Sequence, residues 1–480
     1  MLNLITDRWI PARRHDGSRT TIAPHEMADP ALAFPDWPRP DLNIACLELL
    51  AGLVFMADPP HDAEDWAARQ VPDPERLREC LAPYAPAFEL LGDGPRFLQD
   101  HEAFETGTSD PNPAEMLLID SAGGQTLRNN ADLMVKRDRY PALPLPLAAV
   151  ALYTLQAHAP SGGKGNRTSM RGGGPMVTLV DPGGGLWPLV WANVPDGSPA
   201  PVEALPWMRA TRTSESGQTV VEEDSHPIEA FFGQPRRLRL IAEDDTVTGV
   251  VQRPYGTNYA GWMHPLTPYY RQKVGSELLP RHPRAGAFGY RNWLGIVLQR
   301  PSTADDTARR ARVLELWSER LGPAAEVIVA GWAMDNMKPR DFVFSRAPLL
   351  YLDDAQAERV EGLVMAADRL AVALRDAMVP LLAEGETREG FYLATQSAFE
   401  ARLARLNLDV EAEAKGWLDD LRRVALAQFD ALALPGLAER DTREQAAIVA
   451  ARRYLGATFA GYGKYGRDAF TALGLIPPTP

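Results

Sequence analysis

The strongest constraint on the fold lies after residue 352, where four successive segments show no alternation of apolar and polar residues. Apolar residues in the first segment recur at close to 3.5-residue intervals, which predicts a helix with one apolar stripe. Short connections containing glycine, asparagine or proline separate the segments. We therefore predict an up-down four-helix bundle over residues 351–480. The four segments are residues 354–382, 387–406, 410–432 and 441–473.

Residues 1–350 differ from the bundle because short apolar runs alternate with turns rich in proline and glycine. Several runs indicate strands, and two longer stretches have apolar residues at helical spacing. The predicted fold class is therefore α+β, with a large, irregular mixed domain followed by the bundle. The expected strands include residues 176–180, 186–191, 238–241 and 247–251, and the expected helices include residues 41–56 and 145–157.

The net charge argues against an unselective nucleic-acid binder. It is −13 at pH 7, whereas such proteins usually carry a basic domain. The charge is uneven, because residues 251–300 contain seven basic residues and one acid, Glu277. Two readings remain open: a local phosphate-binding face, or arginines scattered over a surface and paired with acids elsewhere. The basic residues are Arg253, Arg271, Lys273, Arg281, Arg284, Arg291 and Arg300.

The composition also limits the cellular compartment and the kinds of cofactor that we expect for this protein. The two cysteines, Cys46 and Cys80, show no metal-ligand spacing and cannot form a disulfide framework. No apolar run approaches the roughly 20 residues of a membrane-spanning helix, and the first residues lack the pattern of a secretory signal. We expect a cytoplasmic protein with no membrane contact and no cofactor.

Signals of catalysis are weak. The sequence contains no His-Glu-x-x-His, Cys-x-x-Cys, Gly-x-Ser-x-Gly or EF-hand motif. His226 and His264 precede prolines, which indicates structural histidines in turns, and the acidic run at residues 222–224 indicates a solvated loop. The sequence therefore favours a binding protein over an enzyme.

Residues 161–175 form a loop that combines glycines with cations. Glycines let a backbone approach a phosphate closely, and Lys164, Arg167 and Arg171 supply positive charge. The loop is not a P-loop, because Gly165 rather than Ser or Thr follows Lys164, and it lacks Gly-x-Gly-x-x-Gly between a strand and a helix. Three interpretations remain: a clamp on a nucleic-acid backbone, a nucleotide-binding enzyme site, or a flexible surface loop.

A second notable loop lies at residues 331–340, after a predicted buried strand. Its first residue, a glycine, is expected to open a tight connection, with Asp335 and Asn336 at the tip because both tolerate left-handed backbone geometry. Met337 and Lys338 then add an apolar wedge and a cation, which suit insertion into a nucleic-acid groove. The alternative is an ordinary turn with solvated charges.

Five motifs follow one another along the chain, ahead of the helical segments. They are Asn3-Leu4-Ile5-Thr6-Asp7-Arg8-Trp9-Ile10-Pro11, the glycine loop with Arg171-Gly172-Gly173, Tyr255-Gly256-Thr257-Asn258-Tyr259, His264-Pro265-Leu266-Thr267-Pro268, and Gly331-Trp332 through Asn336-Met337-Lys338. Together they resemble the CasA family, the large subunit of the type I-E Cascade, a CRISPR RNA-guided surveillance complex. The resemblance spans essentially the whole length, and the order and spacing of the motifs make it specific.

The resemblance implies a non-enzymatic subunit. Family members recognise the protospacer-adjacent motif in double-stranded DNA, mainly from the minor groove, help open the duplex, and recruit a helicase-nuclease. The implied partners are CRISPR RNA, target DNA, the helicase-nuclease, and the backbone, RNA-end-binding and small subunits. Because the minor groove distinguishes few base-pair patterns, a loop that reads it would tolerate several motifs.

Three elements read DNA in the family: a glycine loop, a wedge on a β-hairpin, and a basic finger. Here the resemblance places them at residues 161–166, at residues 335–337 and at Arg253. Lys164 interrupts the glycine run of better-known members, and Asn336 stands where some members have the longer Gln, so insertion would depend more on Met337. The expected DNA-contacting residues are Gly163, Lys164, Gly165, Asn166, Arg167, Arg171, Arg253, Asp335, Asn336, Met337 and Lys338.

A further family loop, which contacts the RNA end and nearby DNA, corresponds to residues 129–140. Some relatives carry clustered cysteines that suggest zinc, and this chain lacks them, so no metal is expected. The family's bundle packs toward the small subunits and the displaced DNA strand. The candidate RNA-end residues are Asn129, Asn130, Lys136, Arg137 and Arg139, and the candidate cations of the bundle are Arg452, Arg453, Lys464 and Arg467.

Two other functions stay open at this point. One is a structural scaffold of the complex whose loops do not read a motif. The other is a nucleotide-dependent enzyme that uses the glycine loop, which would require a Mg²⁺-holding acid nearby, and none is apparent in the sequence.

Overall fold

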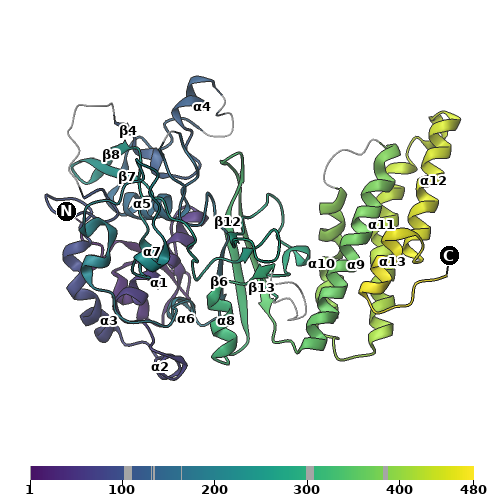
Figure 1. The fold of residues 1–480 in the computed structure, drawn as a ribbon, viewed down its shortest axis with the longest axis horizontal. Coiled ribbons are helices and arrows are strands. Elements are labelled where there is room, and N and C mark those ends of the chain that lie inside the picture. Colours follow the sequence, from purple (N-terminus) through teal and green to yellow (C-terminus); the bar gives the residue numbers. More distant parts are fainter. Residues whose placement is uncertain are drawn as a thin grey trace. The chain divides into compact units, whose positions relative to one another are not determined.

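The chain forms two compact units (Figure 1). The computed structural model describes residues 2–101, 111–130, 132, 136–163, 165–298, 307–381 and 387–479. Unit 1 comprises Met1–Ala285 and Arg309–Leu349, and unit 2 comprises Gly286–Ala308 and Leu350–Pro480. The predicted α+β class is confirmed. The division into domains at residue 350 stays a prediction, and these units differ from it because Gly286–Ala308 belongs with the C-terminal helices.

Two apolar helices, α1 (Pro40–Ala57) and α5 (Leu145–His158), contact each other at the centre of unit 1. Both are buried along almost their whole length, as their uninterrupted apolar sequences require. By length and composition α1 could also cross a membrane, but 89% of it is buried inside the fold, which is the behaviour of a core helix. Both helices match the segments predicted from periodicity.

A long hairpin dominates one sheet of unit 1, whose strand order is β13-β12-β6 (Figure 1). In it, β12 (Ala325–Asp335) pairs antiparallel with β13 (Lys338–Leu349) on one side and with β6 (Val177–Asp181) on the other. The buried stretch of β12, residues 327–331, supplies the core face that the apolar sequence predicted. Helix α1 contacts both strands of the hairpin.

Three further sheets complete the strand framework among the described residues. In one, β8 (Thr246–Arg253) pairs with β7 (Arg237–Glu243) and, through its other edge, with two short strands. The remaining elements of unit 1 are β1 (Ile10–Arg14), β2 (Arg19–Ile22), β3 (Leu32–Pro35), α2 (Ala63–Ala68), α3 (Pro74–Leu81), β4 (Asn112–Pro113), α4 (Gly124–Arg128), β5 (Leu143–Pro144), α6 (Leu186–Ala192), α7 (Glu229–Phe232), β9 (Tyr269–Tyr270), β10 (Leu279–Pro280), β11 (Ala308–Arg309) at the unit boundary, and α8 (Arg312–Glu319).

One predicted strand is wrong: residues 186–191 form helix α6. A short apolar run is compatible with either a buried strand or a buried helix. Pro188 decides between them, because it lies in the first turn of α6, where a missing N–H costs nothing, whereas a central strand would lose a ladder hydrogen bond.

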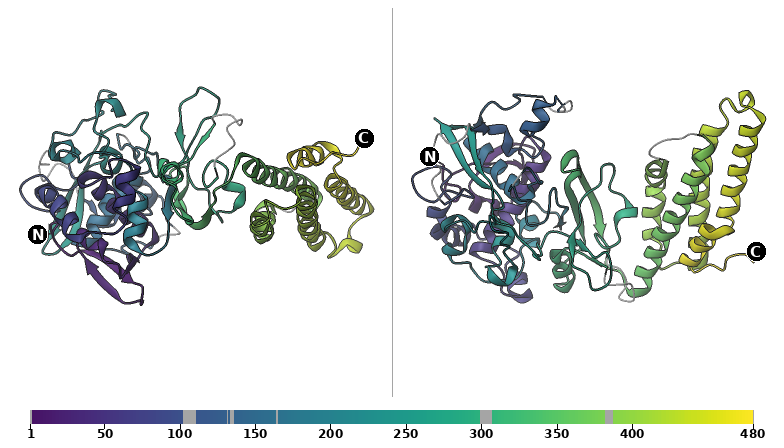
Figure 2. Two further views of the ribbon diagram at one scale, coloured as in Figure 1. Left: turned by 90° about the horizontal axis from the view of Figure 1, so that it is seen from below. Right: turned by 45° about the horizontal axis from the view of Figure 1, so that its top comes forward.

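Unit 2 contains long helices that run side by side, which the left view of Figure 2 shows nearly end-on. Within its described residues, the last predicted segment is two helices rather than one, because Gly461 adopts a left-handed φ of 90° after α12. The helices are α9 (Asp354–Met378), α10 (Thr387–Leu403), α11 (Val410–Ala433), α12 (Thr442–Phe459) and α13 (Gly463–Ala472).

The segment Gly286–Ala308 joins unit 2 through a buried tyrosine. The ring of Tyr290 stacks on Phe399 of α10 with centroids 4.4 Å apart, and its edge meets Trp417 of α11. Its hydroxyl lies 2.8 Å from Thr395 Oγ1. This aromatic core explains why a segment with no helical periodicity belongs to the helical unit.

Candidate nucleic-acid interface

The hairpin ends in a two-residue turn at Asn336 and Met337. Asp335 pairs directly with Lys338, and the two residues between them have φ values of 48° and 62°. Positive φ at both positions defines the tight turn that suits the right-handed twist of the strands. The expected tip at Asp335 and Asn336 was therefore one residue early, since the strand continues through Gly331 to Asp335.

Met337 is 45% exposed although its backbone is in the left-handed region. Such a conformation costs a residue other than glycine about 1–2 kcal/mol, and glycine is the usual occupant of this turn position. Asp335 accepts hydrogen bonds from Asn336 Nδ2 and Arg340 Nη2, each at 3.0 Å. The tip thus presents an apolar side chain and an amide beside exposed cations, Lys338 and Arg340.

The C-terminal half of the glycine loop packs against this hairpin. A Cβ atom on Gly173 would lie 2.9 Å from Met337 Sδ, and one on Gly174 would lie 2.6 Å from the carbonyl oxygen of Trp332. Gly174 also has a φ of 62° and donates its N–H to the carbonyl of His158 at the end of α5. Glycine at both positions therefore allows the loop and the hairpin tip to touch.

The N-terminal half of the same loop packs against the end of β8. Tyr255 donates its N–H to the carbonyl of Gly165 at 2.7 Å, and Gln252 Nε2 donates to Asn166 Oδ1 at 3.0 Å. A Cβ on Gly165 would lie 2.7 Å from Pro254 Cβ. The structure therefore brings the glycine loop beside Arg253, which is half-buried. Gly163 is exposed, and Lys164 lies outside the described residues.

Arg167 connects the glycine loop and the segment after β8 to a third segment, which contains Ser214. Its Nε donates to Ser214 Oγ at 2.8 Å, and Ser214 Oγ donates in turn to the carbonyl of Gly256 at 2.7 Å. Ser214 is 1% exposed and had no sequence signal, because a serine in a polar loop resembles any solvated serine. Arg167 thus braces the loop, and its half-buried guanidinium is less open to a phosphate than its sequence context suggested.

Arg171 requires a correction: it is a core residue and not a surface cation. Its side chain is 2% exposed, and its Nη2 lies 2.7 Å from Glu48 Oε2 on α1. The same guanidinium donates to the carbonyl of Ala157 and to Thr267 Oγ1, both at 3.3 Å. A buried arginine with these acceptors cannot contact a DNA phosphate, so its loss should not change the salt dependence of DNA binding.

Two histidines face the same buried carboxylate. His158 Nε2 donates to Glu48 Oε1 at 2.6 Å, and His264 Nε2 lies 4.0 Å from Glu48 Oε2. His264 Nδ1 accepts the N–H of Leu266, which leaves the proton of the neutral ring on Nε2. Burial alone would raise the pKa of Glu48, but the charge of Arg171 and the hydrogen bond from His158 lower it to about 2.

Acidification should destabilise unit 1 through His264. Burial and the charge of Arg171 hold the pKa of His264 well below its usual value, whereas in an unfolded chain it is about 6.5. The unfolded state therefore binds more protons below pH ~6.5, so the free energy of unfolding falls as the pH drops below that value, by up to ~1.4 kcal/mol per pH unit. The contribution of Glu48 is lost only in stronger acid, between its ordinary pKa and about 2.

The variant His264→Asn provides the matched comparison. Its amide oxygen can accept the N–H of Leu266 but takes up no proton in this range. Urea unfolding, followed from pH ~7.5 to pH ~5.5, should show a wild-type midpoint that falls more steeply than that of the variant. Parallel profiles would show that His264 does not titrate differently in the two states.

The predicted RNA-end loop is charge-compensated in the residues the structure describes. Arg137 pairs with Asp132 and also donates to the Leu127 carbonyl at the end of α4. Arg139 pairs with Asp120 at 3.0 Å. Lys136 is exposed, as are Asn129 and Asn130. A phosphate would have to compete with these carboxylates for the two arginines, which leaves Lys136 the more accessible cation.

The basic run at residues 251–300 does not lie within one unit. Arg253, Arg271, Lys273, Arg281 and Arg284 belong to unit 1, while Arg291 belongs to unit 2, where its guanidinium pairs with Glu389 at 2.6 Å. Arg300 lies outside the described residues. The phosphate-binding interpretation therefore narrows to the five basic residues that belong to unit 1.

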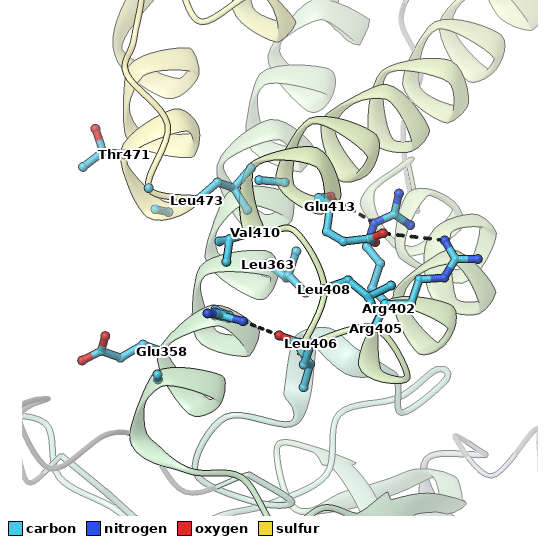
Figure 3. Close-up of a pocket in the computed structure, with 15 residues that line it drawn as sticks. Glu358, Leu363, Arg402, Arg405, Leu406, Leu408, Val410, Glu413, Thr471 and Leu473 are labelled. Carbon is cyan, nitrogen blue, oxygen red and sulfur yellow. Dashed lines mark hydrogen bonds and ion pairs between the residues drawn. The ribbon is translucent and has the colours of Figure 1, made fainter.

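Unit 2 contains a separate cavity of about 350 Å³ between α9, the α10–α11 connection and α13 (Figure 3). Apolar side chains such as Leu363 and Leu473 line it, and the guanidiniums of Arg402 and Arg359 donate to carbonyl oxygens of the protein itself. Among the bundle cations, Arg452 pairs with Asp430. These arginines are already engaged in holding the helices together.

The topology around the glycine loop differs from that of a nucleotide site. The loop follows helix α5 and precedes strand β6, so it does not lead into a helix N-terminus, in contrast to the strand–loop–helix order of a P-loop. Across the described residues, no group of three His, Cys, Asp or Glu side chains is arranged to hold a metal ion.

Comparison with known proteins agrees with the motifs. A family model described as CRISPR-associated protein Cse1 matches residues 3–428. CasA of Thermus thermophilus is 19% identical with a TM-score of 0.73, over 95% of this chain and 98% of that one. Cse1 of Thermobifida fusca is 18% identical with a TM-score of 0.72, over 98% of each chain. A chain of a structure described as a CRISPR RNA-guided surveillance complex is 16% identical with a TM-score of 0.68, over 95% of this chain and 99% of that one.

The structural likenesses show a shared fold, and the family model extends over most of the sequence. The resemblance inferred from the five motifs is thereby confirmed. The chain belongs to the CRISPR-associated Cse1 family, which is also called CasA.

Proposed function

We propose that this protein is the non-catalytic large subunit of a type I-E CRISPR RNA-guided surveillance complex. In this role it reads the protospacer-adjacent motif of double-stranded DNA, helps open the duplex, and recruits the helicase-nuclease. Membership of the Cse1 family and the surveillance complex among the structural relatives support the assignment. The partners would be the other subunits, the CRISPR RNA and the target DNA, in the cytoplasm.

The observation that carries the proposal is the tip of the β12–β13 hairpin. An exposed methionine occupies a backbone position that glycine would occupy at lower cost. Strain of this kind is retained where function requires the side chain. An apolar side chain presented at the end of a rigid hairpin is suited to wedge between base pairs and hold them unstacked.

The glycine loop supports a reading role beside that wedge. Gly162 and Gly163 are exposed, so backbone groups there can approach the floor of a minor groove. The loop contacts both the hairpin tip and the Arg253 segment, so one DNA site could meet all three elements. The net charge of −13 is compatible with this role, because the guide and the other subunits would supply most phosphate contacts.

Reconstitution of the guide-RNA complex with and without this chain tests the proposal. The targets should match the guide and differ only in the flanking motif. We expect omission to abolish discrimination between motifs and to suppress duplex opening. Undiminished discrimination without the chain would assign motif reading to another subunit and leave this one as a scaffold.

A further inference from the structure

Helix α1 carries two buried carboxylates that the function described above does not use. Asp41 and Glu48 are the only charged residues in its sequence, and they are 1% and 0% exposed. Apolar side chains of similar volume would generally be at least as stabilising at such sites, because burying a charge is costly. Their presence in an otherwise apolar helix therefore calls for a reason other than stability.

Each carboxylate holds the base of one proposed DNA-reading element. Glu48 binds Arg171, which lies within the glycine loop, at 2.7 Å. Asp41 Oδ2 accepts a hydrogen bond at 3.2 Å from the indole Nε1 of Trp332, four residues before the hairpin tip on β12. Asp41 and Glu48 are two helical turns apart on the same face of α1, about 10 Å along its axis.

Asp41 is also connected to the third loop. It pairs with Arg39, and Arg39 bridges to Asp120, the carboxylate that binds Arg139 of the predicted RNA-end loop. The glycine loop, the hairpin and the loop at residues 129–140 are thus fastened to one rigid, buried helix. Directional bonds to carboxylates define the position of each attachment more narrowly than apolar contact would.

We infer that α1 sets the spacing between the glycine loop and the hairpin tip, and that Glu48 and Asp41 are positioning residues for motif reading. This inference rests on the function proposed above. A shift of either element would separate the wedge from the loop that reads the motif. Motif discrimination and duplex opening are therefore more sensitive to these bonds than binding to a pre-opened target is.

The test uses two variants in the reconstituted complex. Glu48→Leu with Arg171→Met removes both buried charges together, which avoids leaving an unpaired one. We expect discrimination between motifs to fall about tenfold, the size of one lost base contact. Trp332→Phe removes the donor to Asp41 together with part of the indole, and it retains an aromatic ring against Phe342. We expect it to slow duplex opening about tenfold, as the loss of one hydrogen bond to a charged group would. Binding to a pre-opened target should not change in either case.

A control removes another ion pair of unit 1, in which the arginine is buried and the aspartate is exposed. Arg320→Met with Asp196→Leu eliminates a pair whose arginine also donates to the Val194 carbonyl, and none of these residues belongs to the glycine loop, the hairpin or the loop at residues 129–140. It should leave discrimination and opening as in the wild type. If the Glu48/Arg171 variant folds and discriminates normally, or if Trp332→Phe opens duplexes normally, the inference is overturned. If the proposed function itself were wrong, direct changes to Gly165 or to the hairpin tip would also have no effect on motif discrimination or duplex opening. That result distinguishes failure of the proposed function from failure of the inference about α1.

Discussion

Replacement of both Asn336 and Met337 by glycine should slow opening of a matched target duplex about thirtyfold in the reconstituted complex. That factor corresponds to a wedge that offsets ~2 kcal/mol of the few kcal/mol needed to unstack a base step. Glycine is the informative substitution because both residues have positive φ. Alanine would keep the left-handed strain that Met337 already carries, whereas glycine removes the side chains and allows the turn to form without that strain.

The same double variant should be at least as stable as the wild type. Glycine relieves the left-handed conformation of Met337, a gain of ~1 kcal/mol. Thermal unfolding would therefore show an unchanged or higher midpoint while duplex opening declines. Affinity for a target that is already open should not change. Equal losses on duplex and pre-opened targets would show that the tip contributes to general DNA binding and does not act as a wedge.

The single variants Asn336→Gly and Met337→Gly measure how much each residue contributes to duplex opening. Asn336 is tied to the side chain of Asp335, whereas the methionine side chain is unbranched and 45% exposed. We expect Met337→Gly to account for most of the loss in opening. A larger loss in Asn336→Gly would indicate that the amide contacts base edges and that the methionine is secondary.

Periodicity in the sequence predicted the elements that form the framework of the site. Helices α1 and α5 and strands β7, β8 and β12 have apolar patterns that their own residues determine. Helix α6 was missed because a short apolar run has no unique period. The turn was placed one residue early because Met337 adopts a conformation that its side chain disfavours. The sequence pattern does not indicate a left-handed methionine, because such a conformation is imposed by tertiary structure or function and is not favoured by the residue itself.

The site was predictable as a set of loops but not as a set of contacts. Glycines and a basic residue marked the glycine loop and Arg253, and the structure brings them together. Arg167 and Arg171 have the same charge and lie in the same loop, so the sequence could not separate them. Only their distant partners, Ser214 and Glu48, show that one braces the loop and the other is buried beneath it.

Gly165→Ala should reduce discrimination between motifs about tenfold or more, since loss of a base contact costs ~1–3 kcal/mol. Gly165 has a φ of 75°, and an added Cβ would lie 2.7 Å from Pro254 Cβ and 3.0 Å from the backbone nitrogen of Tyr255. Backbone atoms and a proline ring cannot move aside easily. The glycine loop would have to separate from the Arg253 segment, with the hydrogen bond from Tyr255 weakened. Binding assays with targets that differ only in their motif measure the effect.

Gly183→Ala separates this packing effect from backbone strain. Gly183 has a φ of 76°, almost the same as Gly165, but no atom lies within 4 Å of an added Cβ. Both variants therefore carry the same conformational penalty, and only Gly165→Ala forces the two segments apart. We expect the Gly183 variant to discriminate motifs as the wild type does, even if both unfold at a lower temperature. Equal loss of discrimination in the two variants would attribute it to reduced stability. A normal Gly165 variant would show that contact between the glycine loop and the Arg253 segment is not needed to read the motif.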